Sequence, residues 1–208
     1  MTDLNQNFRF VALQFCGFLT AIFGLQIFLG FEPGFSASSS PWWKFFTSFL
    51  GHSDLNHLLN NLFFLGLFGS IYERFTSGRT FLVTFMLSAI FANLTAFIFF
   101  PSGTIIGASG GAFGVLAALA VYRPKKIGLV LGVPMPMWAV LIIYTLIQVL
   151  GLTGSSSTAY EAHLFGMVVG VLTGLYLVDF DEKETEDEEL DSDDWRQKIR
   201  DWEEKWMM

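Results

Sequence analysis

Four polar residues lie in strongly apolar surroundings and could together carry out acyl transfer. Ser109 lies in a Gly-Ala-Ser-Gly segment at 107–110, and His163 follows much later in the chain. A serine hydroxyl is a weak nucleophile until an adjacent base accepts its proton, and the ordinary pKa of histidine suits it to that task. His57 and Asn61 are spaced i, i+4, so their side chains share one face of a helix. These residue types indicate a nucleophile, a general base and two hydrogen-bond donors.

The composition places these residues in a membrane protein. Of the 208 residues, 52% are hydrophobic and only 15% are charged, whereas soluble domains carry about 25% charged residues. The mean hydropathy is +0.50. The balance of 12 Lys and Arg against 19 Asp and Glu also argues against a nucleic-acid partner. We therefore expect the lipid bilayer to be the main environment of this chain.

The negative net charge belongs to the C-terminal segment. Residues 179–208 contain 14 acidic and 5 basic residues, which accounts for the overall charge of −7. We predict a membrane domain at 1–178 and a short, acidic, disordered tail at 179–208. The end of this tail contains apolar residues at helical spacing, which predict an amphipathic helix on the membrane surface or a docking peptide: Trp195, Ile199, Trp202 and Trp206.

Six apolar segments are long enough to cross a bilayer, since a helix needs about 20 residues to do so. They predict an all-α, six-helix transmembrane bundle with spans at 10–31, 54–72, 79–100, 105–122, 127–151 and 159–178. Pro134 and Pro136 predict a kink or an early turn in the fifth span. The connection at 32–53 is rich in Ser, Pro, Trp and Phe, which predicts an interfacial loop.

The Lys and Arg residues determine the orientation. With a cytoplasmic N-terminus, 11 of the 12 cations lie on the inner side and only Lys44 lies outside. This distribution satisfies the positive-inside rule, so we predict an N-in, C-in topology with a cytoplasmic tail. The compact six-span form fits a prokaryotic plasma membrane, and an organelle membrane stays open as the alternative.

This orientation brings the four polar residues to one depth. The spans at 54–72, 105–122 and 159–178 all begin at the outer face, and Ser109, His57, Asn61 and His163 lie within about two turns of those beginnings. Small residues allow two helix backbones to approach closely, and the fourth and sixth spans carry glycines for this purpose: Gly107, Gly110, Gly111, Gly114, Gly166, Gly170 and Gly174. We therefore expect Ser109 within hydrogen-bond reach of His163. Donors for a developing oxyanion would come from His57, Asn61 and the first turn of the helix that Ser109 begins.

These elements resemble the rhomboid intramembrane serine proteases. The resemblance includes the GxSG motif at 107–110, the His57 to Asn61 pair, and Ala162-His163 with its following glycines. It implies a Ser109–His163 dyad without a carboxylate or a cofactor, and an oxyanion hole made by His57, Asn61 and the Ser109 backbone N–H. It further implies an acyl-enzyme and cleavage of transmembrane substrates near the outer membrane face.

Two residues depart from the common family pattern. Lys44 stands where many members have Arg, which weakens any bidentate contact there. Phe113 stands where some members carry Tyr, so it can pack beneath the histidine ring without donating a hydrogen bond. Neither change removes catalytic machinery.

Other functions compete with proteolysis. A non-catalytic rhomboid-like protein would bind transmembrane helices for quality control or trafficking, but such relatives lack the serine or the histidine. A metal site built from His52, His57 and His163 has poor geometry and no acidic or thiolate ligand. A transporter would need polar residues that reach the midplane and both sides of the membrane, whereas the inner halves of these spans are almost wholly apolar. The sequence leaves the oligomeric state and the identity of the substrate open.

Overall fold

The computed structural model describes residues 9–99, 102–130, 132–154 and 158–206, and in the last range it leaves the side chains of 182–196 and 202–206 undescribed. The chain divides into two compact units, residues 1–174 and 175–208. The first unit holds all the elements up to the first part of the last helix.

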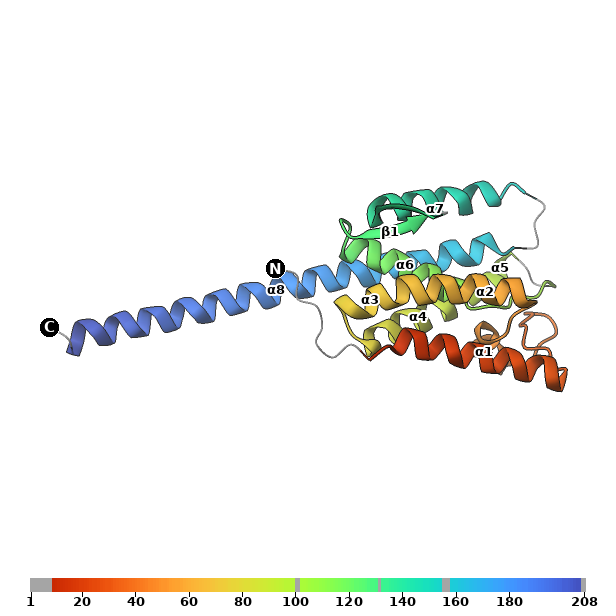
Figure 1. Cartoon of the computed structure of the whole chain (residues 1–208), viewed down its shortest axis with the longest axis horizontal. Helices are drawn as coiled ribbons and strands as arrows, with labels where there is room; N and C mark the ends of the chain where they lie inside the picture. The colour runs from red at the N-terminus through yellow and green to blue at the C-terminus, as the bar shows by residue number, and fades with distance from the viewer. Residues whose placement is uncertain (1–8, 100–101, 131, 155–157, 207–208) are drawn as a thin grey trace. The chain divides into compact units, whose positions relative to one another are not determined.

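The described residues are mostly helical (Figure 1). The elements, in chain order, are α1 (Val11–Leu29), η1 (Trp42–Phe46), η2 (Ser48–Leu50), α2 (Leu55–Phe64), the π-helical turn η3 (Leu65–Gly69), α3 (Ser70–Phe75), α4 (Gly78–Asn93), α5 (Thr95–Ile98), α6 (Ser109–Tyr122), β1 (Ile127–Val130), β2 (Val133–Pro136), α7 (Met137–Gly151) and α8 (Tyr160–Trp206). The segments α2, η3 and α3 follow one another without a break.

Three of the predicted spans correspond to helices that are long and apolar enough to cross a membrane. They are Val11–Leu29, Gly78–Ile98 and Tyr160–Asp181. Two further apolar helices, Ser109–Tyr122 and Met137–Gly151, are shorter. The predicted end of the third span, residue 100, lies outside the described residues. The protein is therefore a mostly helical integral membrane protein.

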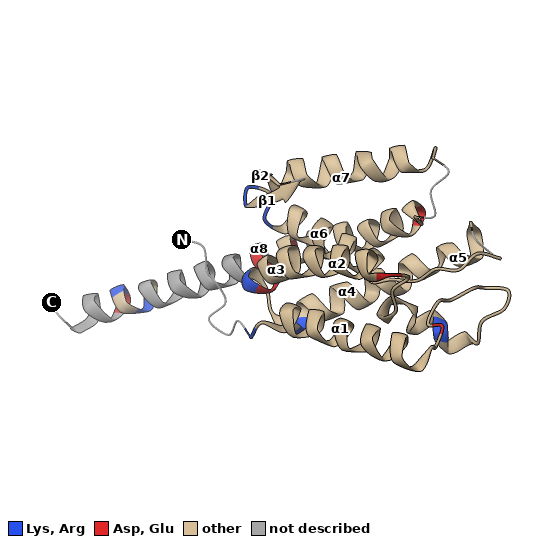
Figure 2. Cartoon of the chain, turned by 45° about the vertical axis from the view of Figure 1, so that its right-hand side comes forward, with Lys and Arg blue, Asp and Glu red and all other residues tan. Residues whose placement is uncertain are grey.

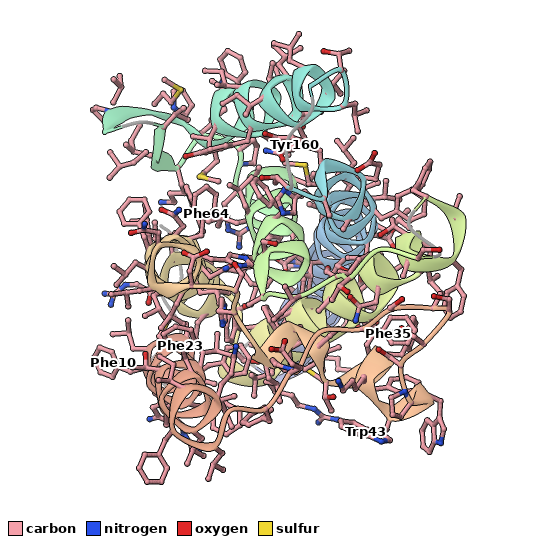
Figure 3. All side chains as sticks on the ribbon, turned by 90° about the vertical axis from the view of Figure 1, so that its right-hand side faces the viewer. Phe10, Phe23, Phe35, Trp43, Phe64 and Tyr160 are labelled. Atoms are coloured by element: carbon pink, nitrogen blue, oxygen red, sulfur yellow. The ribbon has the colours of Figure 1, made fainter. Side chains whose placement is uncertain are left out.

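Helix α6 lies at the centre of the first unit. Almost all of its residues are buried, including the consecutive run Gly110–Ala120. In the view along the helices, α6 lies between α7 at one edge and α1 at the other (Figure 3). A helix that is apolar all round is the type expected at such a position. The prediction that this helix begins at residue 105 was wrong, because residues 105–108 precede the helix and α6 begins at Ser109.

The fifth predicted span, 127–151, is helical only from Met137 onward, so the interruption that its two prolines predict is present. Its first part is an antiparallel hairpin in which Ile127 pairs with Pro136 and Val130 pairs with Val133. A proline in a helix interior removes a hydrogen bond and clashes with the preceding turn. Pro134 and Pro136 therefore exclude a helix until Met137, where α7 begins. The all-α prediction needs this correction.

A buried carboxylate fixes the beginning of α1. Glu73 at the end of α3 is fully buried, and its two carboxylate oxygens accept hydrogen bonds from the backbone N–H groups of Val11 and Ala12, both at 3.0 Å. The first N–H groups of a helix have no partner within it. Glu73 supplies that partner, and so ties α1 to the segment that follows α2.

Charged residues of the first unit gather at the ends of its helices (Figure 2). Most Lys and Arg residues lie at the end where α1 begins, α3 ends and β1 begins, and the opposite end has a single blue segment beside red ones. Consecutive helices alternate in direction, so every second connection lies at the same end, and most of the Lys and Arg residues lie in those connections.

The second unit is the remaining part of α8. The sequence predicts disorder for the acidic residues of 179–194, whereas helix α8 includes them and extends to Trp206. Neither Pro nor Gly occurs between Leu175 and Trp206, and Glu and Lys are good helix formers. The amphipathic pattern at its end stays a prediction, because of its apolar residues only Ile199 has a described side chain, and that side chain is exposed.

Candidate active site

Ser109 and His163 meet at the beginnings of two helices. Ser109 is the first residue of α6 and His163 lies in the first turn of α8. The Nε2 atom of His163 lies 2.8 Å from the Oγ atom of Ser109, which is the distance of a good hydrogen bond. His163 is buried, with 8% of its surface exposed. The arrangement can move a proton from the hydroxyl to the imidazole.

Backbone-to-backbone packing of α6 against α8 brings these two residues together. A Cβ atom placed on Gly166 would overlap the carbonyl oxygen of Gly110, and one on Gly170 would overlap that of Gly114. Only glycine allows this approach. The glycines that follow each site residue therefore set the distance between the two helices and the reach of His163.

Two aromatic rings, those of Phe113 and Tyr160, contact the imidazole of His163. The ring of Phe113, one turn after Ser109, lies 4.6 Å from the ring of His163 at an angle of 31°. Phe113 in turn contacts Phe64 of α2, with ring centroids 5.2 Å apart. The ring of Tyr160, labelled in Figure 3, is nearly perpendicular to that of His163, with ring centroids 6.3 Å apart. These contacts hold the imidazole in one orientation.

Gln148 is the residue that the sequence reasoning missed. Its Oε1 atom lies 2.7 Å from the Nδ1 atom of His163, so both ring nitrogens of the histidine have partners. Gln148 lies on α7 in a predicted span. A polar residue in a membrane span is a functional candidate by default, and this rule would have found it.

The segment before Ser109 is held by backbone hydrogen bonds to the first loop. Phe35 and Ile105 exchange two such bonds, of 2.9 and 2.8 Å, and the N–H of Gly107 donates to the carbonyl of Ser48 at 3.1 Å. Gly107 has a φ of +114°, a conformation that disfavours any residue with a Cβ. Loop 32–53 thus has a positioning role at the start of α6.

His57 packs against this same glycine. A Cβ atom on Gly107 would lie 2.5 Å from both Cε1 and Nε2 of His57, so the imidazole lies directly over the backbone two residues before Ser109. On its other side, Nδ1 of His57 pairs with the hydroxyl of Ser53 at 3.0 Å. The structure therefore brings His57 to the beginning of α6.

Asp54 prepares the helix that carries His57. Its carboxylate accepts the backbone N–H of His57 at 2.9 Å and so caps α2. The cap fixes the residue at which α2 begins, and so fixes the position of His57 in the first turn of that helix.

Asn61 is buried one turn further along α2. Its amide donates a hydrogen bond to the carbonyl of His57 at 2.9 Å, which uses one of the two amide N–H groups. The described hydrogen bonds thus tie Asn61 to its own helix and do not join it to Ser109. Its role at the site stays a prediction.

A model of the rhomboid domain matches residues 39–180. The chain belongs to the rhomboid family. The match includes His57, Asn61, Ser109, Gln148 and His163.

Relatives of this rhomboid match parts of their own length. Rhomboid-like protease 3 of Toxoplasma gondii is 27% identical over 164 residues, which cover 76% of this chain and 57% of that protein. Rhomboid-like protein 11, chloroplastic, of Arabidopsis thaliana is 34% identical over 77 residues, which cover 36% of this chain and 28% of that protein. Rhomboid protease GluP of Bacillus subtilis (strain 168) is 33% identical over 78 residues, which cover 38% of this chain and 15% of that protein. This chain thus covers less than two thirds of each relative.

His52 of this rhomboid is a neutral, buried histidine of the loop before α2. Burial lowers its pKa to about 4. Its backbone N–H and carbonyl pair with the side-chain amide of Gln26 on α1, at 3.1 and 2.7 Å, and its ring lies 5.2 Å from that of His57. Among the residues that the structure describes, no group of three His, Cys, Asp or Glu side chains gathers to hold a metal.

Proposed function

We propose that this rhomboid is an intramembrane serine protease that cleaves transmembrane segments of membrane proteins. The observation that carries the proposal is the 2.8 Å contact between Ser109 Oγ and His163 Nε2. Family membership supports it further, since two of the relatives are named rhomboid proteases. Membrane proteins are the substrate class that the family implies.

The mechanism needs only the side chains described. Ser109 Oγ attacks the scissile carbonyl carbon while its proton passes to His163 Nε2. The protonated histidine then gives this proton to the leaving amine, and the C–N bond breaks to leave an acyl-enzyme on Ser109. Water attacks the acyl-enzyme, passes a proton to the same nitrogen, and releases the acid product with the hydroxyl restored.

Three groups can donate hydrogen bonds to the negatively charged carbonyl oxygen of the tetrahedral intermediate. We assign the oxyanion hole to His57, Asn61 and the backbone N–H of Ser109. The first N–H groups of a helix lack intrahelical partners and lie at the positive end of its dipole. The position of His57 over Gly107 supports this assignment.

The proposed topology has six spans with both termini in the cytoplasm. The clustering of Lys and Arg at one end of the helices supports this orientation (Figure 2). Helix α6 has 14 residues and is about 21 Å long, shorter than the ~30 Å hydrocarbon core. Ser109 would thus lie below the outer surface, where cleavage takes place. We assign the chain to a prokaryotic plasma membrane, with the membrane domain at 1–178 and the tail inside.

Labelling by a fluorophosphonate probe tests the proposed function. We expect the purified full-length protein, in detergent, to react with the probe and to carry it on Ser109 when the modified peptide is identified by mass spectrometry. Absence of labelling, or labelling at other serines only, would contradict the proposal. It would favour a non-catalytic protein that binds transmembrane helices.

Asn61→Ala is expected to lower the rate of proteolysis by about 10²-fold, because removing one oxyanion donor typically has an effect of this size. The variant should remain folded and should still react with the probe. The exposed neighbour Asn60 provides the matched control, and Asn60→Ala should cleave at the wild-type rate. Cleavage of a fluorogenic transmembrane peptide measures both. Full activity of Asn61→Ala would remove this residue from the oxyanion hole.

A further inference from the structure

The side chain of Gln148 is a polar group in an apolar helix. Helix α7 reads Met-Trp-Ala-Val-Leu-Ile-Ile-Tyr-Thr-Leu-Ile-Gln-Val-Leu-Gly, and Gln148 is buried in it with 3% of its surface exposed. Burial of an amide is costly unless it makes hydrogen bonds. The bond that Gln148 makes goes to Nδ1 of His163 at 2.7 Å, so the cost of burial is offset at the proposed base.

This contact selects one form of the imidazole. A neutral imidazole carries a proton on one nitrogen and a lone pair on the other. The amide oxygen of Gln148 can only accept, so the proton lies on Nδ1 and the lone pair on Nε2. Nε2 is the atom that faces the Ser109 hydroxyl at 2.8 Å. The opposite tautomer would present an N–H to Ser109 and could not accept its proton.

We propose that Gln148 is a positioning residue for His163, so that the site is a Ser109–His163–Gln148 triad in which a neutral amide orients the base. The inference rests on the proposed protease function. Gln148 acts only through His163, and its hydrogen bond becomes charge-assisted when His163 takes the proton. It therefore strengthens during the reaction, which raises the rate of the chemical step.

The neighbours of Gln148 hold α7 in place for this task. Tyr144, one turn earlier on α7, packs against Phe64 of α2 with ring centroids 5.0 Å apart, and against Phe113 of α6 at 6.0 Å. The reactivity of Ser109 therefore depends on the position of α7, through Gln148.

Two substitutions at this position separate hydrogen bonding from packing. Gln148→Leu keeps the size and removes the acceptor, whereas Gln148→Glu keeps the shape and an acceptor oxygen. We expect Gln148→Leu to lower the maximal rate of fluorophosphonate labelling about 10- to 100-fold with the half-saturating probe concentration unchanged, since bonds to charged groups have effects of this size. Gln148→Glu should restore the rate. Its carboxylate favours the protonated base, so the acidic limb of its pH profile should move to higher pH.

Thr145→Val is the matched control, because Thr145 lies on the same helix and its described contact is a weak one, from its hydroxyl to the sulfur of Met167 at 3.8 Å, and not one to Ser109 or His163. It should label at the wild-type rate. If Gln148→Leu labels as fast as wild type, or if Gln148→Glu fails to restore the rate, Gln148 does not position the base and the triad is overturned. Absence of labelling in the wild type would instead overturn the proposed function, and with it the triad.

A second measurement does not depend on activity. In the Ser109→Ala protein with ¹⁵N-labelled histidine, NMR reports the tautomer of each of the three histidines, and His163→Ala identifies the signal of His163. We expect the proton on Nδ1 when Gln148 is present and a mixture of tautomers in Gln148→Leu. The same tautomer in both proteins would overturn the inference even if the wild type is active.

Discussion

Ser109→Ala is expected to lower the rate of substrate cleavage by about 10⁶-fold, because loss of the nucleophile or the base of a serine protease has an effect of this size. His163→Ala should lose about as much. The Oγ and Nε2 atoms lie 2.8 Å apart and would act in one proton transfer in the proposed mechanism. Each residue therefore does nothing for this step without the other.

The double variant distinguishes this coupling from two independent roles. If Ser109 and His163 act as a unit, removing both should cost no more than removing either, whereas independent contributions would multiply. Cleavage of a transmembrane peptide, followed to long times in detergent or in vesicles, measures the residual rates. Losses that multiply would argue against the dyad.

Ser88 supplies the matched control for the serine substitution. It is buried on α4, and its hydroxyl is one of the few buried side-chain groups in the described part of the chain without a hydrogen-bond partner. Removing such a hydroxyl leaves no group unsatisfied. Ser88→Ala should therefore fold, react with the fluorophosphonate probe and cleave substrate as the wild type does. If Ser88→Ala also lost activity, removal of a buried serine hydroxyl would by itself impair the protein. The loss in Ser109→Ala would then not identify a nucleophile.

The proximity of Ser109 and His163 could be predicted from the sequence because several independent patterns agree. Cation placement gave the direction of the spans, and the direction gave the depth of each polar residue. Glycine spacing then indicated which helices approach closely. These patterns depend on the membrane, which restricts where charges and polar side chains can lie.

The parts that were not predicted depend on local geometry that spacing does not encode. Hydropathy alone cannot separate the hairpin β1–β2 from the helix α7 that follows it, since both are apolar. It also extends the fourth span to residue 105, although the backbone before Ser109 is held in an irregular form by loop 32–53. The hydrogen bond from Nδ1 of His163 to the amide oxygen of Gln148 requires the relative rotation of α7 and α8, which only the packed structure contains.

Gly166→Leu is expected to lower activity on the order of 10³-fold and to destabilise the fold. A Cβ atom at this position overlaps the carbonyl oxygen of Gly110, which is backbone and cannot rotate away. The two helices must separate by more than about 1 Å, and a misplacement of this size costs about 10²-fold in rate. The remaining atoms of the leucine side chain need further space, which increases the loss. Gly166→Ala should show a smaller loss in the same direction.

Gly24→Leu on α1 separates this effect from the general cost of replacing a glycine in a membrane helix. Gly24 is exposed, and a Cβ atom there meets nothing within 4 Å. The Gly24→Leu protein should unfold at the same temperature as the wild type and should cleave substrate at the same rate. Thermal unfolding and peptide cleavage, measured on both variants, give the comparison. If Gly166→Leu stayed as active as Gly24→Leu, the close approach of α6 and α8 would not be what sets the distance from Ser109 to His163. The glycines after each site residue would then serve only the packing of the bundle, and the geometry of the dyad would have to come from Phe113 and Gln148.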